Sequence, residues 1–456
     1  MRSRIFISIL TGLFILLLSC GDDGVTPEPL FEGDLVLDSQ TAVDAAGRKG
    51  HIEITGSLII DDDQTSPITD LSPLSTITSI SGDLIVSEAG DLTNLEGLNG
   101  LEEIGGAVLI TGNGFLQNID ALRNVTRYNE PEVRIIDNYR LISIRGLQGL
   151  DLAKSVSIRD NYELPNLDGL QNLRGVTQSF QFIRSSGITD LEGLSGLQYT
   201  GDLTILGGDI EDLSALSALD SVGGTMRLNY FTQLTDLADL TNLSYVNGLD
   251  LRGNERLASL DGLSGINTIA GDLRIEACNA LTDLRGLESL VQALDINIYN
   301  NENLSSLNGF NNLEDLHLLS LSENPKLTDL SALGNLKQVF DNIAIAENSQ
   351  LRSLQGLEGL TSVDNLYIAE NPLLVDLNGL RNIETLGDIS LTNNPGLTAL
   401  DAFEGLSQMD RFSAKGNINL ADFCGIANID IKVNYQAADN AFNPTEADLA
   451  SGNCRN

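Results

Sequence analysis

The chain has 456 residues, of which 26 are basic and 64 acidic, so its formal net charge is −38. This balance excludes a general nucleic-acid binder, which needs a basic surface, and it disfavours direct binding to anionic lipid. Tryptophan is absent, which weakens the case for an aromatic platform that binds carbohydrate.

Residues 1–19 read MRSRIFISILTGLFILLLS, and Cys20 follows directly. Two arginines, a short apolar run and a Leu-Leu-Ser-Cys junction are typical of a lipoprotein signal peptide. The apolar run is short for a membrane-spanning helix. We therefore expect cleavage before Cys20 and lipid attachment to it, with an uncleaved anchor as the alternative. Several acyl chains, at about 0.8 kcal/mol per buried methylene, would then hold the protein on a membrane.

Residues 20–33, CGDDGVTPEPLFEG, combine acids, glycines and two prolines, which predicts a flexible tether after the lipidated cysteine. The CGDDG stretch resembles the acidic signal that sends lipoproteins of Bacteroidota to the cell surface. That resemblance implies an outer-membrane protein facing outward. A solvated acidic linker on a lipoprotein of the periplasmic face is the alternative.

Residues 34–425 repeat one pattern about fifteen times, with a period of 23–25 residues. A fixed period of this size indicates a solenoid, because each unit is too small to bury its own apolar face. Apolar pairs spaced by two predict one strand per coil. Examples are Leu249 and Leu251, and Leu273 and Ile275. The pattern is less regular where Ser185, Gly208 and Phe231 replace the expected asparagine, but no linker composition interrupts it.

Three residues after each apolar pair comes a small polar residue, which is asparagine in ten coils. We expect these side chains to point inward and to bond backbone groups that the corner leaves unpaired. Cys278 fills the same slot once, and we expect it to stay buried and unpaired. The ten members of this predicted asparagine ladder are Asn113, Asn138, Asn161, Asn254, Asn301, Asn324, Asn348, Asn371, Asn394 and Asn417.

A second polar column occupies the aspartate position of the recurring Leu-Thr-Asp-Leu motif. A catalytic reading is poor, because an active site needs one constellation and not a repeated row. We interpret the column as a turn device. Its fourteen members are Asp70, Asn94, Asn118, Ser143, Asn166, Asp190, Asp212, Asp236, Ser259, Asp283, Ser306, Asp329, Ser353 and Asp376. The glycines that follow in many coils, such as Gly286 and Gly379, suggest a sharp bend or a positive φ.

Together these columns resemble the receptor L domain, a relative of leucine-rich repeats found in receptor ectodomains and bacterial surface proteins. The entry segment, residues 33–60, is also similar to the first coil of the bacterial members. The resemblance covers nearly the whole mature chain. It implies a mainly β, right-handed β-solenoid with N- and C-terminal caps, and it does not name a ligand.

Residues 426–456 break the period and are expected to form the C-terminal cap. Cys424 lies in the last predicted coil and Cys454 near the end of the chain. In an oxidising compartment after export, these two are expected to form a disulfide that fastens the cap, with two free thiols as the alternative.

One group of outward residues on adjacent predicted strands is a candidate ligand patch: Arg227, Arg252, Arg274 and Tyr299. Three arginines are unusual in so acidic a protein. The simpler interpretation is that Arg227, Asp250 and Arg274 alternate in one column and form ion pairs across strands, each contributing little.

Weak calcium binding is a further hypothesis, since Asp61, Asp62 and Asp63 are adjacent, although no known calcium motif appears. No metal site or other cofactor is predicted. His51 and His317 are far apart in the array, no Cys/His cluster offers zinc ligands, and no nucleophile elbow, P-loop or dinucleotide fingerprint is present.

The sequence therefore predicts a lipid-anchored, cell-surface recognition or adhesion protein that is not an enzyme and that binds a protein or glycan on its solenoid face. One alternative is a scaffold or accessory lipoprotein subunit that binds other outer-membrane proteins. A second is a polysaccharide-active enzyme built on a β-helix, which would require acid–base residues gathered in a cleft.

Overall fold

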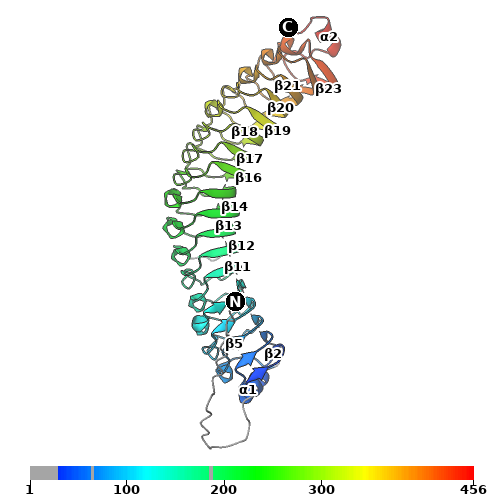
Figure 1. Cartoon of the computed structure of the whole chain (residues 1–456). Coiled ribbons are helices and arrows are strands. Elements are labelled where there is room, and N and C mark those ends of the chain that lie inside the picture. The colour runs from blue at the N-terminus through cyan, green and yellow to red at the C-terminus, as the bar shows by residue number, and fades with distance from the viewer. Residues whose placement is uncertain (1–28, 63–65, 184–187) are drawn as a thin grey trace, which may run out of the picture.

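The structure is a computed structural model, and it describes residues 29–62, 66–183 and 188–456. The described residues form a curved rod of stacked coils, with the strands along its inner side and the connecting loops along its outer side (Figure 1). In the described ranges, no helix combines the length and the apolar character needed to cross a membrane.

One parallel sheet runs the length of the rod, and each of its strands pairs with the strands of the coils before and after it. Among the described residues it has eighteen strands: β2 (Leu35–Leu37), β4 (Leu58–Asp61), β6 (Leu84–Ser87), β8 (Val108–Thr111), β10 (Glu132–Ile136), β11 (Leu152–Arg159), β12 (Gly175–Ile183), β13 (Tyr199–Leu206), β14 (Ser221–Asn229), β15 (Tyr245–Arg252), β16 (Thr268–Glu276), β17 (Gln292–Tyr299), β18 (Asp315–Ser322), β19 (Gln338–Ala346), β20 (Ser362–Ala369), β21 (Thr385–Thr392), β22 (Gln408–Lys415) and β23 (Asp430–Ala438).

A second, short parallel sheet accompanies the first coils: β1 (Leu30–Phe31), β3 (Glu53–Ile54), β5 (Ser79–Ile80), β7 (Glu103–Ile104) and β9 (Arg127–Tyr128). From β11 onward the two strand segments of a coil join into one strand, and several of the pairings between these longer strands contain a β-bulge. The predicted mainly β solenoid is confirmed, and the pairing continues without a break through the irregular coils of β12 to β15.

The helical elements lie between the strands and at the two ends. The α-helices are α1 (Gln40–Lys49) and α2 (Glu446–Ala450). The 3-10 helices are η1 (Ser72–Leu74), η2 (Asp120–Asn124), η3 (Arg145–Leu147), η4 (Glu192–Leu194), η5 (Ser214–Leu216), η6 (Ala238–Leu240), η7 (Ser331–Leu333), η8 (Asn378–Leu380), η9 (Asp401–Phe403) and η10 (Cys424–Ile426).

The core is a set of continuous apolar columns inside the coils. The inward pair is buried on the strands from β4 to β22, as with Leu273 and Ile275 on β16 or Ile343 and Ile345 on β19. Because each coil covers its neighbour, this core grows with every repeat and does not depend on a single globular centre.

All ten predicted ladder asparagines are fully buried. Asn371 is typical: its Nδ2 donates to the carbonyls of Ile345 and Ala369, at 2.9 and 2.8 Å, and its Oδ1 accepts the N–H of Asn348 at 3.1 Å. Cys278 is a free, buried thiol in the same slot, and burial raises its pKa to about 12. Phe231 also occupies a ladder slot, where its N–H donates to Asn254 Oδ1 at 2.9 Å.

The second polar column is a row of side-chain-capped turns, as predicted. In all fourteen members the side-chain oxygen accepts the backbone N–H two residues later. At Asp212 the hydroxyl and the N–H of Ser214 both bond the carboxylate, and these bonds lower its pKa.

The glycine column divides into two groups, so its predicted positive φ is only partly right. Gly286 has φ 106°, and a Cβ there would lie 2.2 Å from the Leu260 carbonyl oxygen. Gly379 instead lies within η8, without a positive φ. Ala332 takes the same slot within η7, so that corner accepts a methyl group, whereas a Cβ at Gly379 would lie 1.9 Å from the Leu354 carbonyl oxygen.

Sequence reasoning missed a third repeated feature at the corners. The residue just before each ladder position adopts a left-handed conformation, as at Asn300, Glu323, Glu347 and Glu370, with φ from 55° to 57°. Left-handed backbone at non-glycine residues is uncommon. Gly253 in the same slot was the signal that could have revealed it.

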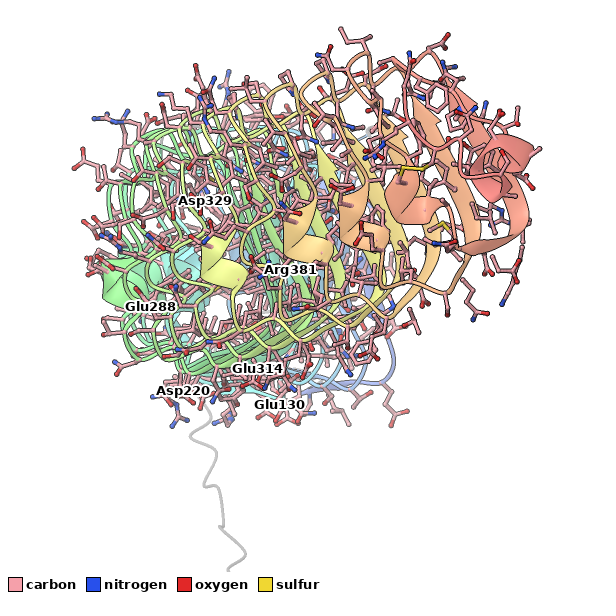
Figure 2. The ribbon with its side chains drawn as sticks, turned by 90° about the horizontal axis from the view of Figure 1, so that it is seen from above. Glu130, Asp220, Glu288, Glu314, Asp329 and Arg381 are labelled. Carbon is pink, nitrogen blue, oxygen red and sulfur yellow. A yellow bond between two sulfur atoms is a disulfide. The ribbon has the colours of Figure 1, made fainter. Side chains whose placement is uncertain are left out.

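The C-terminal end differs from the predicted boundary at residue 425. Strand β23 continues the sheet, and Asn440 continues the ladder by accepting the N–H of Asn417 at 3.0 Å. Segment 426–456 therefore supplies one more coil as well as the cap. Cys424 and Cys454 are joined by a disulfide at this end, which is visible in Figure 2 near α2.

Candidate functional site

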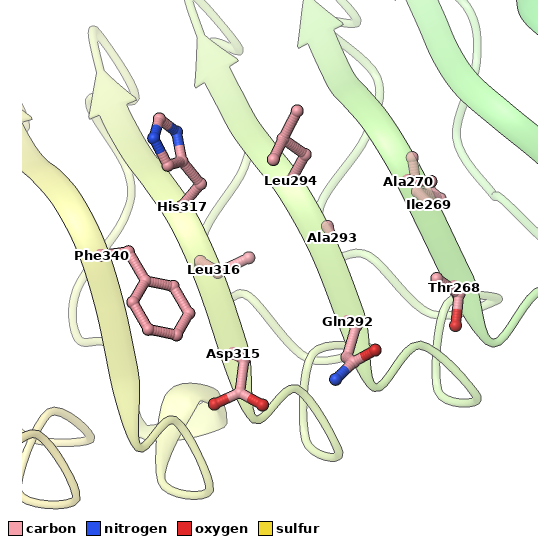
Figure 3. Close-up of a pocket in the computed structure, with 10 residues that line it drawn as sticks. All are labelled: Thr268, Ile269, Ala270, Gln292, Ala293, Leu294, Asp315, Leu316, His317 and Phe340. Carbon is pink, nitrogen blue, oxygen red and sulfur yellow. The ribbon is translucent and has the colours of Figure 1, made fainter.

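A shallow groove lies on the exposed face of the sheet, across β16 to β19 (Figure 3). Strands β17 and β18 have eight residues each and pair in regular register. Their outer neighbours β16 and β19 have nine each, and the register shifts at both outer pairings. A bulge bends its strand and redirects its side chains. Two bulged strands flanking two regular ones therefore leave a hollow between them.

The groove has a volume of about 370 Å³ and is mainly apolar. Its base is formed by the buried side chains of Ile269, Ala293 and Leu316. Leu294 and Phe340 rise beside it and remain 44% and 59% exposed. Figure 3 shows them on the same face of the sheet, on β17 and β19, with β18 between them. The other lining residues are Thr268, Ala270, Gln292, Asp315 and His317.

The polar border of the groove is acidic. His317 Nδ1 lies 3.0 Å from Asp295 Oδ1, and Asp272 is the register partner of Asp295 on the adjacent strand. Asp315 lines the groove where β18 begins. A nearby cation, Lys337, is already paired with a carboxylate, since its Nζ lies 2.6 Å from Glu314 Oε2.

The predicted arginine patch lies on β14 to β17, nearer the carboxyl ends of the strands than the groove. Arg227, Asp250 and Arg274 are register partners on β14, β15 and β16. Arg252 forms a two-point contact with Asp250, with Nε to Oδ1 at 2.8 Å and Nη2 to Oδ2 at 2.9 Å, and this bond raises the pKa of the guanidinium.

Arg274 and Tyr299 of the patch also contact neighbouring side chains. The Arg274 guanidinium carbon lies 5.6 Å from the centre of the Tyr299 ring. The Tyr299 hydroxyl donates to Glu276, and the pKa of Tyr299 is raised by partial burial and by this bond. The structure thus favours the ion-pair interpretation for Arg252, whose charge is compensated by Asp250, whereas Arg274 stacks on Tyr299.

The other predicted site residues are placed as follows. Cys20 and Asp63 lie outside the described residues. Asp61 accepts the Ser87 hydroxyl at 3.0 Å, and the buried Asp62 accepts the Ile68 N–H at 3.0 Å. Both carboxylates therefore have structural hydrogen bonds, and no group of three metal-ligating side chains occurs in the described part of the chain.

The two histidines are in unrelated surroundings. His51 is buried near the N-terminal end, with its ring 5.1 Å from that of Phe31, whereas His317 is exposed at the groove. They do not combine into an acid–base site. The groove instead has the features of a binding surface: an apolar base, exposed hydrophobic walls and a charged border.

Two other hollows, of about 490 and 310 Å³, lie along the corner loops. They are lined by the left-handed residue of successive coils and the residue two positions later, for example Glu370 with Pro372, and Asn393 with Pro395. Since the same pair recurs from coil to coil, these hollows follow from the repeat and do not single out one site.

Sequence reasoning missed the groove, although the repeat length carried a signal. Leu249 and Leu273 are 24 positions apart, Leu273 and Ile296 are 23 apart, and Ile296 and Leu319 are 23 apart. The next step, to Ile343, is again 24. The longer coils are those that carry the bulges flanking the groove.

No family model matches the chain, and no curated protein matches it. Solved structures that are similar in fold include the internalin InlF of Listeria monocytogenes, 18% identical, covering 77% of this chain and 95% of that chain, with a TM-score of 0.41. The functional domain of InlJ from the same organism is 17% identical over 80% of this chain and 74% of that chain, with a TM-score of 0.36. A leucine-rich-repeat protein of Leptospira interrogans is 14% identical over 86% of this chain and 94% of that chain, with a TM-score of 0.33.

These superpositions are loose, and they bring no information about a ligand. The assignment of a leucine-rich-repeat-like solenoid depends on this chain's own strand register, buried leucine columns and asparagine ladder.

Proposed function

We propose that this protein is a lipid-anchored recognition or adhesion protein of the bacterial cell surface. It is not an enzyme, and it binds a protein or glycan ligand on the exposed face of its main sheet, along the inner side of the curved rod. The receptor L-domain resemblance and the lipoprotein-type signal before Cys20 support the extracytoplasmic part of this proposal. Outer-membrane attachment facing outward is the favoured location, with the periplasmic face as the alternative.

The groove is the observation that carries the binding role. Large apolar side chains normally lose contact with water on folding, and complete burial of one contributes about 1.5–3 kcal/mol. Leu294 and Phe340 stay exposed on one face of the sheet, at a groove with an apolar base. A ligand that covers them would gain this burial without any rearrangement of the sheet.

The anchoring part is tested by labelling cells with radioactive palmitate. We expect label in the wild-type chain and none in the Cys20→Ala variant, which should also leave the membrane fraction. Protease treatment of intact cells then distinguishes the two faces, because only a surface-exposed solenoid would be digested.

The binding part is tested by measuring binding of the purified chain to envelope proteins and to a glycan panel. We expect saturable binding that falls in the Leu294→Ser and Phe340→Ser variants. Val375→Ser is the matched control, because Val375 is 51% exposed and lies outside the groove. Binding that is unchanged in both groove variants would refute the proposed site.

A further inference from the structure

We infer that the groove accepts an extended protein segment that combines a large apolar side chain with basic residues a few positions away. This inference rests on the proposed function and specifies its ligand. It follows from the shape of the groove, from the charges around it and from their separation along the sheet.

The groove selects the apolar part of the ligand. Its volume of about 370 Å³ suits one or two large aliphatic or aromatic side chains, and its lining is mainly apolar, with Ile269, Ala293 and Leu316 at the base. The walls, Leu294 and Phe340, would contact such a side chain on two sides. A sugar ring would leave most of its hydroxyl groups facing this apolar base without partners.

Acidic side chains around the groove select the basic residues of the ligand. Asp272, Asp295 and Asp315 border the groove on β16 to β18. Beyond Phe340, the exposed residues Asp364 on β20 and Asp410 on β22 continue an acidic row across the sheet. Arg252 and Arg274 lie in the other half of their strands, where they are paired with Asp250 or stacked on Tyr299. Arg411 on β22 is next to Asp410 but is paired with Asp388 at 2.7 Å.

The distances favour an extended chain that crosses the strands. Neighbouring strands are about 4.8 Å apart, so β18 and the row on β20 to β22 are separated by roughly 10–20 Å. An extended peptide advances about 3.3 Å per residue, so three to six residues separate the apolar anchor from the basic group. Lys432 on β23 ends the acidic row and limits the length of the segment.

The test uses the full-length chain in a non-ionic detergent and three fluorescein-labelled heptapeptides. The first peptide has two leucines, a Ser-Gly-Ser spacer and two arginines. The second replaces the arginines with glutamates, and the third replaces the leucines with serines. Fluorescence anisotropy gives the dissociation constant of each peptide for the wild type and for the Phe340→Ser, Asp364→Asn and Val375→Ser variants.

We expect the dissociation constant of the first peptide to be at least about ten-fold lower than that of either other peptide. Phe340→Ser and Asp364→Asn should each weaken it several-fold, whereas Val375→Ser should not. Circular dichroism melting curves, unchanged in these surface variants, show that the loss is not due to unfolding.

Three results would overturn the inference: no binding of the first peptide, equal binding of the serine peptide, or equal binding by the groove variants. Equal binding of the serine peptide would mean that net charge alone attracts it. If the peptides fail while an oligosaccharide or an acidic protein binds in a Phe340-dependent way, the ligand class is wrong and the proposed recognition role stands. If no ligand binds in that way, the proposed site fails as well.

Discussion

Replacement of Asn371 by alanine tests the physical basis of the solenoid. The change removes two short donated hydrogen bonds, to the carbonyls of Ile345 and Ala369, and one short accepted bond, from the N–H of Asn348. It also removes two longer bonds of 3.4 Å to the side chains of the ladder neighbours Asn348 and Asn394. Each buried group left without a partner costs about 1–3 kcal/mol. Because neighbouring losses are not additive, we expect a total of about 3–5 kcal/mol.

Urea unfolding, monitored by circular dichroism, measures how far the substitution lowers the free energy of global unfolding. Native-state hydrogen exchange measures the local part, because one coil of a solenoid can open without the rest. Asn382→Ala is the matched control. Its side chain makes one exposed hydrogen bond, to the Glu358 carbonyl at 2.8 Å, and should cost less than about 1 kcal/mol.

The reasoning is refuted if Asn371→Ala and the control differ by less than about 1 kcal/mol and if exchange near residue 371 does not change. That result would mean that water enters the corner and replaces the amide. The ladder would then be a consequence of the repeat and would not contribute to its stability.

Further predictions concern the cysteines. Reduction of the Cys424–Cys454 disulfide should destabilise the cap by about 3–4 kcal/mol in the entropic model, seen as faster proteolysis after residue 424, whereas an unchanged digestion pattern would count against a fastening role. Burial raises the pKa of Cys278 to about 12. The neutral thiol therefore contributes fully to the free energy of unfolding below the unfolded thiol pKa of about 8.5, and this contribution is lost as the pH rises towards 12. Between these values, the unfolding free energy of the wild type should fall faster than that of Cys278→Ala, by about 1.4 kcal/mol per pH unit, and equal slopes would contradict the buried thiol. A Cys278→Asn variant should be more stable than the wild type in urea, because an amide can donate to the Leu251 carbonyl that now faces the sulfur at 3.7 Å, and a loss of stability would show that the slot is too small.

The amino-acid sequence by itself determined the repeat, the strand positions and the inward asparagines. These features depend on spacing within one coil and on the burial that stacking requires, so periodicity is sufficient to predict them. The turn column was predictable for the same reason, since Asp329 and its equivalents bond a backbone group only two residues away.

Only the tertiary structure decided what lies between coils. The groove depends on how an extra residue in β16 and β19 shifts the register against β17 and β18. The stacking of Arg274 on Tyr299 likewise joins two neighbouring strands. The sequence did not predict the last coil, because β23 lacks the inward leucines found in other strands. That strand is recognised by its pairing with β22. Contacts within a coil are local in sequence, whereas a site shared by four coils depends on small differences in coil length that accumulate across the stack.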